Sequence, residues 1–202
     1  MKYEGKIEPV LYLNGNKKRL IRFMRLFIAI PLPEDIRHEL SDFQDHNLNV
    51  RWVSPEQMHL TLKFLGQVNN IQKKQVTKLL SEIRFDSFQI AVKGFGFFPE
   101  KGSLRVFWAG IQTETPALHE LQKKVEKAAL EFGIQKDKHP YIPHVTLGRI
   151  NDHSLKKADL IRPESEISSR KFTVKHFKLY QSFLQPEGAI HKILKVFRSK
   201  QM

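Results

Sequence analysis

Two short stretches decide the fold of this chain: His59-Leu60-Thr61-Leu62 and its repeat, His144-Val145-Thr146-Leu147. Both read His, apolar, Thr, apolar. Side chains alternate between two faces along a strand, so the histidine and threonine of each copy point one way while the apolar residues point into a core. With nine histidines and 41% hydrophobic residues, roughly 0.05 such tetrads would arise by chance. The repeat therefore predicts two strands, each presenting a polar platform backed by a packed core.

The sequence around these stretches mixes strand patterns with helix patterns. Strands are expected over residues 25–31, 50–53, 58–65, 85–98, 104–111, 144–150, 172–183 and 190–197. Apolar residues recur at helical spacing after residue 33, over 72–84 and over 116–132, where Gly133 is expected as a left-handed C-cap. Several of the strands follow one another closely enough to form hairpins. This order favours an α+β fold with antiparallel sheets over a doubly wound parallel sheet.

The first 23 residues differ from the rest of the chain. Residues 1–23 mix Gly and Asn with a basic cluster and show no sustained period, whereas Met24 directly precedes the first clean strand. One hypothesis is that Met24 is the functional start and that residues 1–23 are a dispensable extension. The alternative is an ordinary extra strand and turn near residues 10–13. No linker-like stretch follows, so residues 24–202 are expected to form a single domain, in one or two lobes.

The charge balance indicates a polyanionic partner. Lys and Arg number 34 against 21 Asp and Glu, which gives a formal net charge of +13. Such a field attracts nucleic acid or anionic membrane surfaces, although a merely basic enzyme is the alternative. No cysteine is present, which excludes disulfides, Cys-based zinc sites and thiol nucleophiles. No apolar run approaches the ~20 residues that span a bilayer, and residues 26–32 are too short for a signal peptide.

The two motifs carry the residue types that phosphodiester hydrolysis needs. In-line attack of water on phosphorus requires one group that accepts a proton and one that donates a proton to the leaving oxygen. The imidazoles of His59 and His144 can do either near neutral pH. The hydroxyls of Thr61 and Thr146 can donate hydrogen bonds to the non-bridging phosphate oxygens. Metal binding is the competing reading, but two histidines are too few for a catalytic zinc site. No metal and no cofactor are predicted.

Five further residues are candidates with two readings each. Arg149 directly follows the second motif, and alternation along the strand points it to the face opposite that of His144. It therefore contacts the phosphate only if the strand ends or twists there; otherwise it is a surface arginine. Lys63 shares the parity of the first histidine and either contacts the backbone of a bound nucleic acid or is solvated. Phe64, Phe97 and Tyr141 could stack on bases, although core packing is the favoured reading for each.

The paired motifs resemble those of the two-histidine phosphoesterase superfamily. Within it, the chain is similar to the bacterial and archaeal RNA 2′,3′-cyclic phosphodiesterases, also called 2′-5′ RNA ligases. The resemblance runs from about residue 24 to 198 and is carried by residues 25–30, 51–53, 58–66, 94–99, 105–110 and 143–149. Residues 1–23 fall outside it.

This resemblance implies a fold, an activity and a partner. The fold is a bilobal α+β domain, in which two antiparallel β-sheets flank a central basic groove with helices on the outside. The activity is hydrolysis of a terminal 2′,3′-cyclic phosphate to a 2′-phosphomonoester, with His59 as proton donor and His144 as proton acceptor. Thr61, Thr146 and Arg149 bind substrate. The near-identical motifs do not by themselves assign the two histidine roles. In reverse, the same pair could form a 2′-5′ linkage.

The implied partner is RNA with 2′,3′-cyclic phosphate ends, for which tRNA halves are candidates. A cytoplasmic monomer without a membrane partner is expected. Two other functions stay open: a cyclic phosphodiesterase acting on small nucleotides or ADP-ribose derivatives, and a non-catalytic RNA-binding module. The net charge of +13 favours RNA over a small nucleotide, and the two intact motifs argue against the non-catalytic module.

Overall fold

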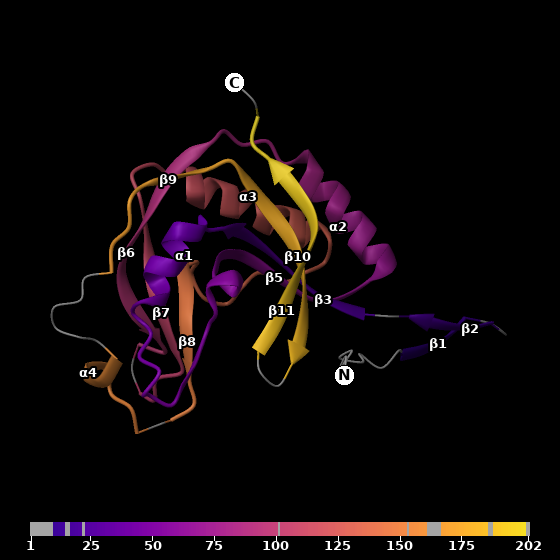
Figure 1. Cartoon of the computed structure of the whole chain (residues 1–202). Helices are drawn as coiled ribbons and strands as arrows, with labels where there is room; N and C mark the ends of the chain where they lie inside the picture. The colour runs from indigo at the N-terminus through magenta and orange to yellow at the C-terminus, as the bar shows by residue number, and fades with distance from the viewer. Residues whose placement is uncertain are drawn as a thin grey trace.

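The computed structural model describes residues 10–14, 17–21, 23–100, 102–152, 154–160, 167–185 and 188–200 (Figure 1). Its elements in chain order are β1 (Val10–Asn14), β2 (Lys17–Ile21), β3 (Phe23–Pro31), α1 (Glu34–Ser41), β4 (Val50–Trp52), the 3-10 turn η1 (Pro55–Gln57), β5 (His59–Asn69), α2 (Asn70–Glu82), β6 (Phe88–Phe98), β7 (Val106–Thr113), α3 (Ala117–Glu131), β8 (His144–Ile150), α4 (Lys157–Leu160), β9 (Phe172–Val174), β10 (His176–Gln185) and β11 (Gly188–Arg198).

One curved antiparallel sheet forms the body of the molecule. Its strands run in the order β11-β10-β3-β5-β8-β7-β6-β9, and β4 pairs with β8 beside this path. Helix α3 packs on β5 and on α2, and Figure 1 shows both helices beside the curved sheet. The prediction of an α+β fold with antiparallel strands is therefore confirmed.

The sheet has two halves, and each half contains one of the His-x-Thr strands. β5 ends one half and β8 begins the other, and the two strands pair at only one position, Leu60 opposite Val145. Further along β8, the same edge is occupied by β4 and by Val53, whose N–H donates to the carbonyl of Leu147 at 2.9 Å. The two sheets implied by the resemblance are thus the two halves of one sheet, which meet at the motifs.

A single large core backs both motifs. The four apolar motif residues are at most 2% exposed: Leu60, Leu62, Val145 and Leu147. Helices α1, α2 and α3 bury Ile36, Val76 and Val125 in the same cluster, among others. Burying such an aliphatic side chain contributes about 1.5–3 kcal/mol, so the face opposite the core is held firmly. Within the described ranges, no helix has the length and apolar character needed to cross a bilayer.

The start of α2 differs from the sequence prediction, whereas the end of α3 agrees with it. Helix α2 begins at Asn70, earlier than expected, because Asn69 and Gln72 form a capping box in which each side chain bonds the other's backbone N–H. Gly133 lies just after α3 with φ of +90°. This confirms the expected left-handed C-cap, a conformation that costs glycine no steric penalty.

Each motif strand contains a β-bulge directly after its threonine. The extra residues are Leu62 on β5 and Leu147 on β8, because consecutive residues of the neighbouring strand pair on either side of each one. A bulge inserts one residue into the alternation of side chains. On β8 the residues beyond the bulge therefore face the side opposite to the one that their sequence parity predicts. On β5 this holds for Lys63 and Phe64, because a second extra residue, Leu65, restores the original alternation.

Strands β1 and β2 form an antiparallel two-stranded sheet of their own. This agrees with the expectation of an extra strand near residues 10–13. Within the described ranges neither strand pairs with the nine-stranded sheet, and Figure 1 shows the hairpin projecting beyond β3.

Candidate active site

Each motif histidine is held in the same way by the backbone two residues before it. Nδ1 of His59 lies 2.6 Å from the carbonyl oxygen of Gln57, and Nδ1 of His144 lies 2.8 Å from that of Ile142. A carbonyl oxygen can only accept, so Nδ1 carries the proton of each neutral ring and donates it. Both rings therefore keep Nε2 as a free proton acceptor.

The meeting of β5 and β8 arranges the four polar motif residues as a platform. Continuing the register of their one pair by a residue on either side sets His59 opposite Thr146 and Thr61 opposite His144. The histidines then occupy diagonal positions, which on one face of an antiparallel pair lie roughly 7–8 Å apart. In the described part of the chain, neither threonine hydroxyl takes part in a hydrogen bond. Two imidazoles and two hydroxyl groups therefore gather on one face where the two strands meet.

His59 lies in an aromatic and partly buried setting. Its ring centroid is 4.8 Å from that of Phe27 and 5.3 Å from that of His191. Burial lowers the pKa of His59 to about 4, and the nearby charges of His191, His144 and Arg149 contribute in the same direction. The imidazole is therefore neutral at pH 7 in the free protein, and these side chains are close enough to act on it electrostatically.

His144 rests against two aromatic rings from its own half of the sheet. The ring of Phe98 meets it edge-on at 5.0 Å between centroids, and that of Trp108 lies at 5.8 Å. Burial also lowers the pKa of His144, and the charge of Arg149 adds to this shift. The second imidazole is thus neutral near pH 7 as well.

Gly96 makes room for the ring that supports His144. It pairs with Trp108 across β6 and β7, and a Cβ added there would overlap carbon atoms of that indole. We predict that Gly96→Ala displaces Trp108, destabilises the protein by about 1–3 kcal/mol and lowers kcat about tenfold by disturbing His144. Urea unfolding and steady-state kinetics test this. A variant with unchanged stability and kcat would show that the indole adapts without cost.

Arg149 lies on the same face as His144, contrary to its sequence parity. The bulge at Leu147 reverses the alternation, and Arg149 then stands directly opposite Arg51 of β4. Burial lowers the pKa of Arg149, and the charge of Arg51 lowers it further. No carboxylate pairs with either arginine among the residues that the structure describes. The site face therefore carries uncompensated positive charge next to the platform.

The structure contradicts both predictions for Lys63, contact with the substrate backbone and exposure to solvent. The bulge at Leu62 turns it to the core face, where it is 2% exposed and neither solvated nor on the face of His59. Its ammonium group lies 2.9 Å from Glu126 and 3.0 Å from Asp137. Parity counted from the motif could not reveal this, because the extra residue exists only in the pairing with β3.

The three aromatic candidates, Phe64, Phe97 and Tyr141, differ in their burial and contacts. Phe97 is 4% exposed and stacks on Phe107 at 5.1 Å, so core packing is correct for it. Phe64 is 62% exposed, because it follows both the motif and the bulge, and the core reading is wrong for it. Tyr141 is partly buried and donates its hydroxyl to the carbonyl of Thr61 at 3.1 Å.

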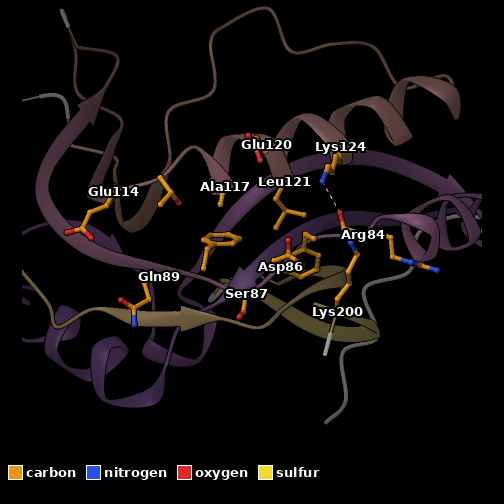
Figure 2. A pocket seen from close by; sticks show the side chains of 13 residues that line it. Arg84, Asp86, Ser87, Gln89, Glu114, Ala117, Glu120, Leu121, Lys124 and Lys200 are labelled. Carbon is orange, nitrogen blue, oxygen red and sulfur yellow. Dashed lines mark hydrogen bonds between the residues drawn. The ribbon is translucent and has the colours of Figure 1, made fainter. Parts of the chain in front are cut away.

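A pocket of about 1190 Å³ opens beside the platform. Thr61 and His144 are among its lining residues, together with Phe64, residues of α3 and residues 136–142. A second pocket, of about 560 Å³, lies at the start of α3 and next to Lys200 (Figure 2). No motif residue lines that second pocket, so the larger one is the candidate for holding the rest of a substrate.

Sequence reasoning missed His191, which belongs to the surroundings of the site. It lies on β11, beyond β10 and β3 from β5, and its ring contacts that of His59 across those two strands. Its Nδ1 is buried and has no hydrogen-bond partner among the described residues. No local signal marks it, because only the strand order of the sheet brings β11 near β5.

The described part of the chain contains no group of three or more His, Asp or Glu side chains placed to hold one metal ion. The Nδ1 atoms of both motif histidines are also engaged by carbonyl oxygens. What the site offers is proton transfer, hydroxyl donors and positive charge.

A curved antiparallel sheet that joins two His-x-Thr strands at their motifs is the arrangement of a two-histidine phosphoesterase. The family model described as LigT-like phosphoesterase matches residues 30–108 and 110–191. The chain is 34% identical over 176 residues to the RNA 2′,3′-cyclic phosphodiesterase of Methanocaldococcus jannaschii, covering 85% of this chain and 99% of that relative. It is 36% identical over 177 residues to the enzyme of the same name from Archaeoglobus fulgidus, covering 86% of this chain and 99% of that one.

Solved structures agree with these relatives. Escherichia coli LigT complexed with 3′-AMP superposes with a TM-score of 0.73 at 26% identity, covering 89% of this chain and all of that one. A structure described as a phosphoesterase superposes with a TM-score of 0.77 at 27% identity over the same share of this chain. The chain belongs to the LigT-like phosphoesterase family.

Proposed function

We propose that the protein is a metal-independent RNA 2′,3′-cyclic phosphodiesterase that converts a terminal 2′,3′-cyclic phosphate into a 2′-phosphomonoester and a 3′-hydroxyl. The names of the relatives support the reaction. The observation that supports it most within this chain is the matched pair of imidazoles, which keep both Nε2 atoms free on one face of the sheet.

The proposed mechanism divides the proton transfers between the two motifs. Water attacks phosphorus opposite the 3′ oxygen and gives its proton to Nε2 of His144. The bond from phosphorus to the 3′ oxygen breaks, and Nε2–H of His59 protonates that oxygen. The hydroxyls of Thr61 and Thr146 donate to the non-bridging oxygens, and Arg149 offsets the negative charge that gathers there.

The same groups can serve ligation. A 5′-hydroxyl in place of water would give its proton to His144 and attack the cyclic phosphate, the 3′ oxygen would leave with a proton from His59, and a 2′-5′ linkage would form. RNA with cyclic phosphate ends is the proposed partner, with tRNA halves among the candidates. A cytoplasmic monomer is the proposed state of the protein.

The direct test is incubation with an oligonucleotide that ends in a 2′,3′-cyclic phosphate, with and without EDTA. The expected product is the 2′-phosphomonoester, identified by chromatography against both isomers, at a rate that the chelator leaves unchanged. Formation of the 3′-phosphomonoester, or strong inhibition by EDTA, would contradict the proposal.

The pH dependence follows from the two lowered imidazole pKa values. Catalysis needs one protonated and one neutral ring, yet in the free protein the pKa of His59 is about 4 and that of His144 lies below its ordinary value. Raising the pH above these values removes the required proton. We predict that kcat/KM, which reports the free enzyme, is greatest below pH 6.5 and falls as the pH rises to 8.

The profile of kcat should lie at higher pH than that of kcat/KM. A bound phosphate is negatively charged and favours the protonated form of a neighbouring imidazole, so it raises the pKa of His59 in the complex. Initial rates measured from pH 4.5 to 8.5 give both profiles. A kcat/KM optimum at or above pH 7.5 would be incompatible with the buried, neutral imidazoles.

We also propose that residues 1–23 are a dispensable extension of a single bilobal domain, residues 24–202. The family model begins at residue 30, and the β1–β2 hairpin pairs only with itself among the described strands. A chain that starts at Met24 is expected to keep its melting temperature and, within about twofold, its kcat/KM. A truncated chain that is unfolded or inactive would reject this division.

A further inference from the structure

Lys63 is a buried lysine with a complete set of partners. It follows the first motif on β5 and is 2% exposed. Its Nζ donates to Oε1 of Glu126 at 2.9 Å and to the carbonyl of Gln135 at 3.0 Å, and lies 3.0 Å from Oδ2 of Asp137. An ammonium group has three hydrogens to donate; here Glu126 and Gln135 accept two hydrogen bonds, and Asp137 adds an ion pair.

Core stability alone does not explain a lysine at this position. Removing a charge from water is costly, and a well-packed apolar residue is often as stabilising as a buried ion pair. What a lysine adds is direction, because its ammonium group joins Glu126 and Gln135 by hydrogen bonds and Asp137 by an ion pair at one point. The bulge at Leu62 is the feature that aims it toward them.

The acceptors lie on α3 and on the segment that leads into the second motif. Residues 135–142, here called the approach segment, connect α3 to β8 and contain no helix or strand. Lys63 holds the beginning of this segment at Gln135 and Asp137. Tyr141 ties its end to the same strand through the carbonyl of Thr61. Strand β5 therefore fixes the approach segment at both ends.

The approach segment in turn orients the second imidazole. The carbonyl of Ile142 accepts the hydrogen bond from Nδ1 of His144, which sets both the rotation of the ring and its tautomer. The backbone of His144 is held by β7, where Gly110 stands opposite it. Between the two halves, however, β5 and β8 pair only at Leu60 and Val145. Side-chain ties therefore add to the alignment of the two halves at the site.

We propose that Lys63 is a positioning residue that fixes the approach segment to β5 and thereby holds His144 in the orientation and tautomer that face His59. Its kinetic consequences rest on the proposed function, whereas its effect on the His144 tautomer does not. Lys63 has a second effect, because Glu126 and Asp137 both line the pocket beside the platform. Its charge offsets two carboxylates that would otherwise repel an anionic substrate.

The double variant K63M/E126Q separates positioning from charge. It removes one positive and one negative charge together, so the net charge of this wall of the pocket is unchanged and KM is expected to stay within about twofold. The approach segment loses its tie, and kcat should fall about 10–100-fold, since small misplacements of catalytic groups have effects of this size. The single variant K63M exposes the carboxylates as well and should also raise KM.

Lys124 provides a matched control on the same helix. It too ties α3 to a backbone carbonyl, that of Arg84, at 2.9 Å, but at the second pocket (Figure 2). Lys124→Met should leave kcat and KM unchanged. Equal losses in K124M and K63M/E126Q would indicate a general loss of stability and overturn the proposal.

Nitrogen NMR of the histidine rings provides a readout that needs no substrate. At pH 7.5 the wild-type protein should show His144 as the Nδ1–H tautomer, and K63M/E126Q should show a mixture of tautomers. A folded double variant with wild-type kcat and an unchanged His144 tautomer would overturn the proposal. If the wild-type protein does not open cyclic phosphate ends, the proposed function fails, and the NMR result still decides the role of Lys63.

A milder variant covers the case in which the double variant does not fold. Asp137 is 65% exposed at its side chain, so Asp137→Asn keeps the buried pair and loosens only the segment side of the tie. We expect kcat to fall about threefold, with a partial shift of the His144 tautomer. If K63M/E126Q is unfolded and D137N matches the wild type in both readouts, Lys63 serves stability and not positioning.

Discussion

Replacing His59 or His144 with alanine is expected to lower kcat by about 10²–10⁴-fold in each case, because each variant loses one positioned proton transfer. Both rings lie partly exposed on the site face, so the fold should survive, as circular dichroism and thermal unfolding can verify. His38 is a suitable control, since its side chain on α1 is 60% exposed and its Nε2 lies 3.9 Å from Glu34. His38→Ala should retain kcat within about twofold.

A substrate with sulfur in place of the bridging 3′ oxygen separates the two histidine roles. A thiolate leaves without protonation, so this substrate does not need a general acid. If His59 is the proton donor, His59→Ala should regain most of its lost rate on the sulfur substrate, whereas His144→Ala should not. Rescue of His144→Ala alone would reverse the assignment, and rescue of neither would remove general-acid catalysis from the mechanism.

Replacing Thr61 or Thr146 with valine is expected to lower kcat by about 10²-fold each. Valine keeps the shape of threonine but lacks the hydroxyl, and removal of one donor to a developing phosphoryl or acyl oxyanion typically has an effect of this size. Because both hydroxyls act on one phosphate, the double variant should lose less than the product of the two single losses.

Serine variants test whether the hydroxyl is the active part of each threonine. Thr61→Ser and Thr146→Ser keep the donor and should stay within a fewfold of the wild type. Thr77→Val on α2 removes a hydroxyl that bonds the carbonyl of Lys73, and serves as a control outside the site. If the serine variants are as slow as the valine variants, the threonine methyl groups and not the hydroxyls matter, which would contradict the donor role.

A β-bulge, which is a tertiary feature, places the positive charge of Arg149 next to the second motif. Arg149 faces the site only because Leu147 is an extra residue in the pairing of β8 with β7. Like charges directly opposite each other in a sheet are destabilising, yet Arg149 stands opposite Arg51. An anion on this face would relieve that repulsion, which agrees with a phosphate-bearing substrate.

The sequence by itself determined the two motif strands, their buried apolar residues, the α+β class and the pair of histidines. Each of these depends on alternation between neighbouring residues or on residue chemistry, both of which are local. Helix boundaries such as Asn70 and the C-cap at Gly133 are local too, because capping involves side chains within one turn.

Only the tertiary structure decided which way Lys63, Phe64 and Arg149 face, and that His191 lies beside His59. A bulge is defined by pairing with another strand, so an extra residue cannot be recognised by counting along its own strand. The contacts of Lys63 with Glu126, and of His59 with His191, join residues far apart in the chain. Packing of the sheet against α3 and the order of its strands bring them together, and neither leaves a periodic signal in the sequence.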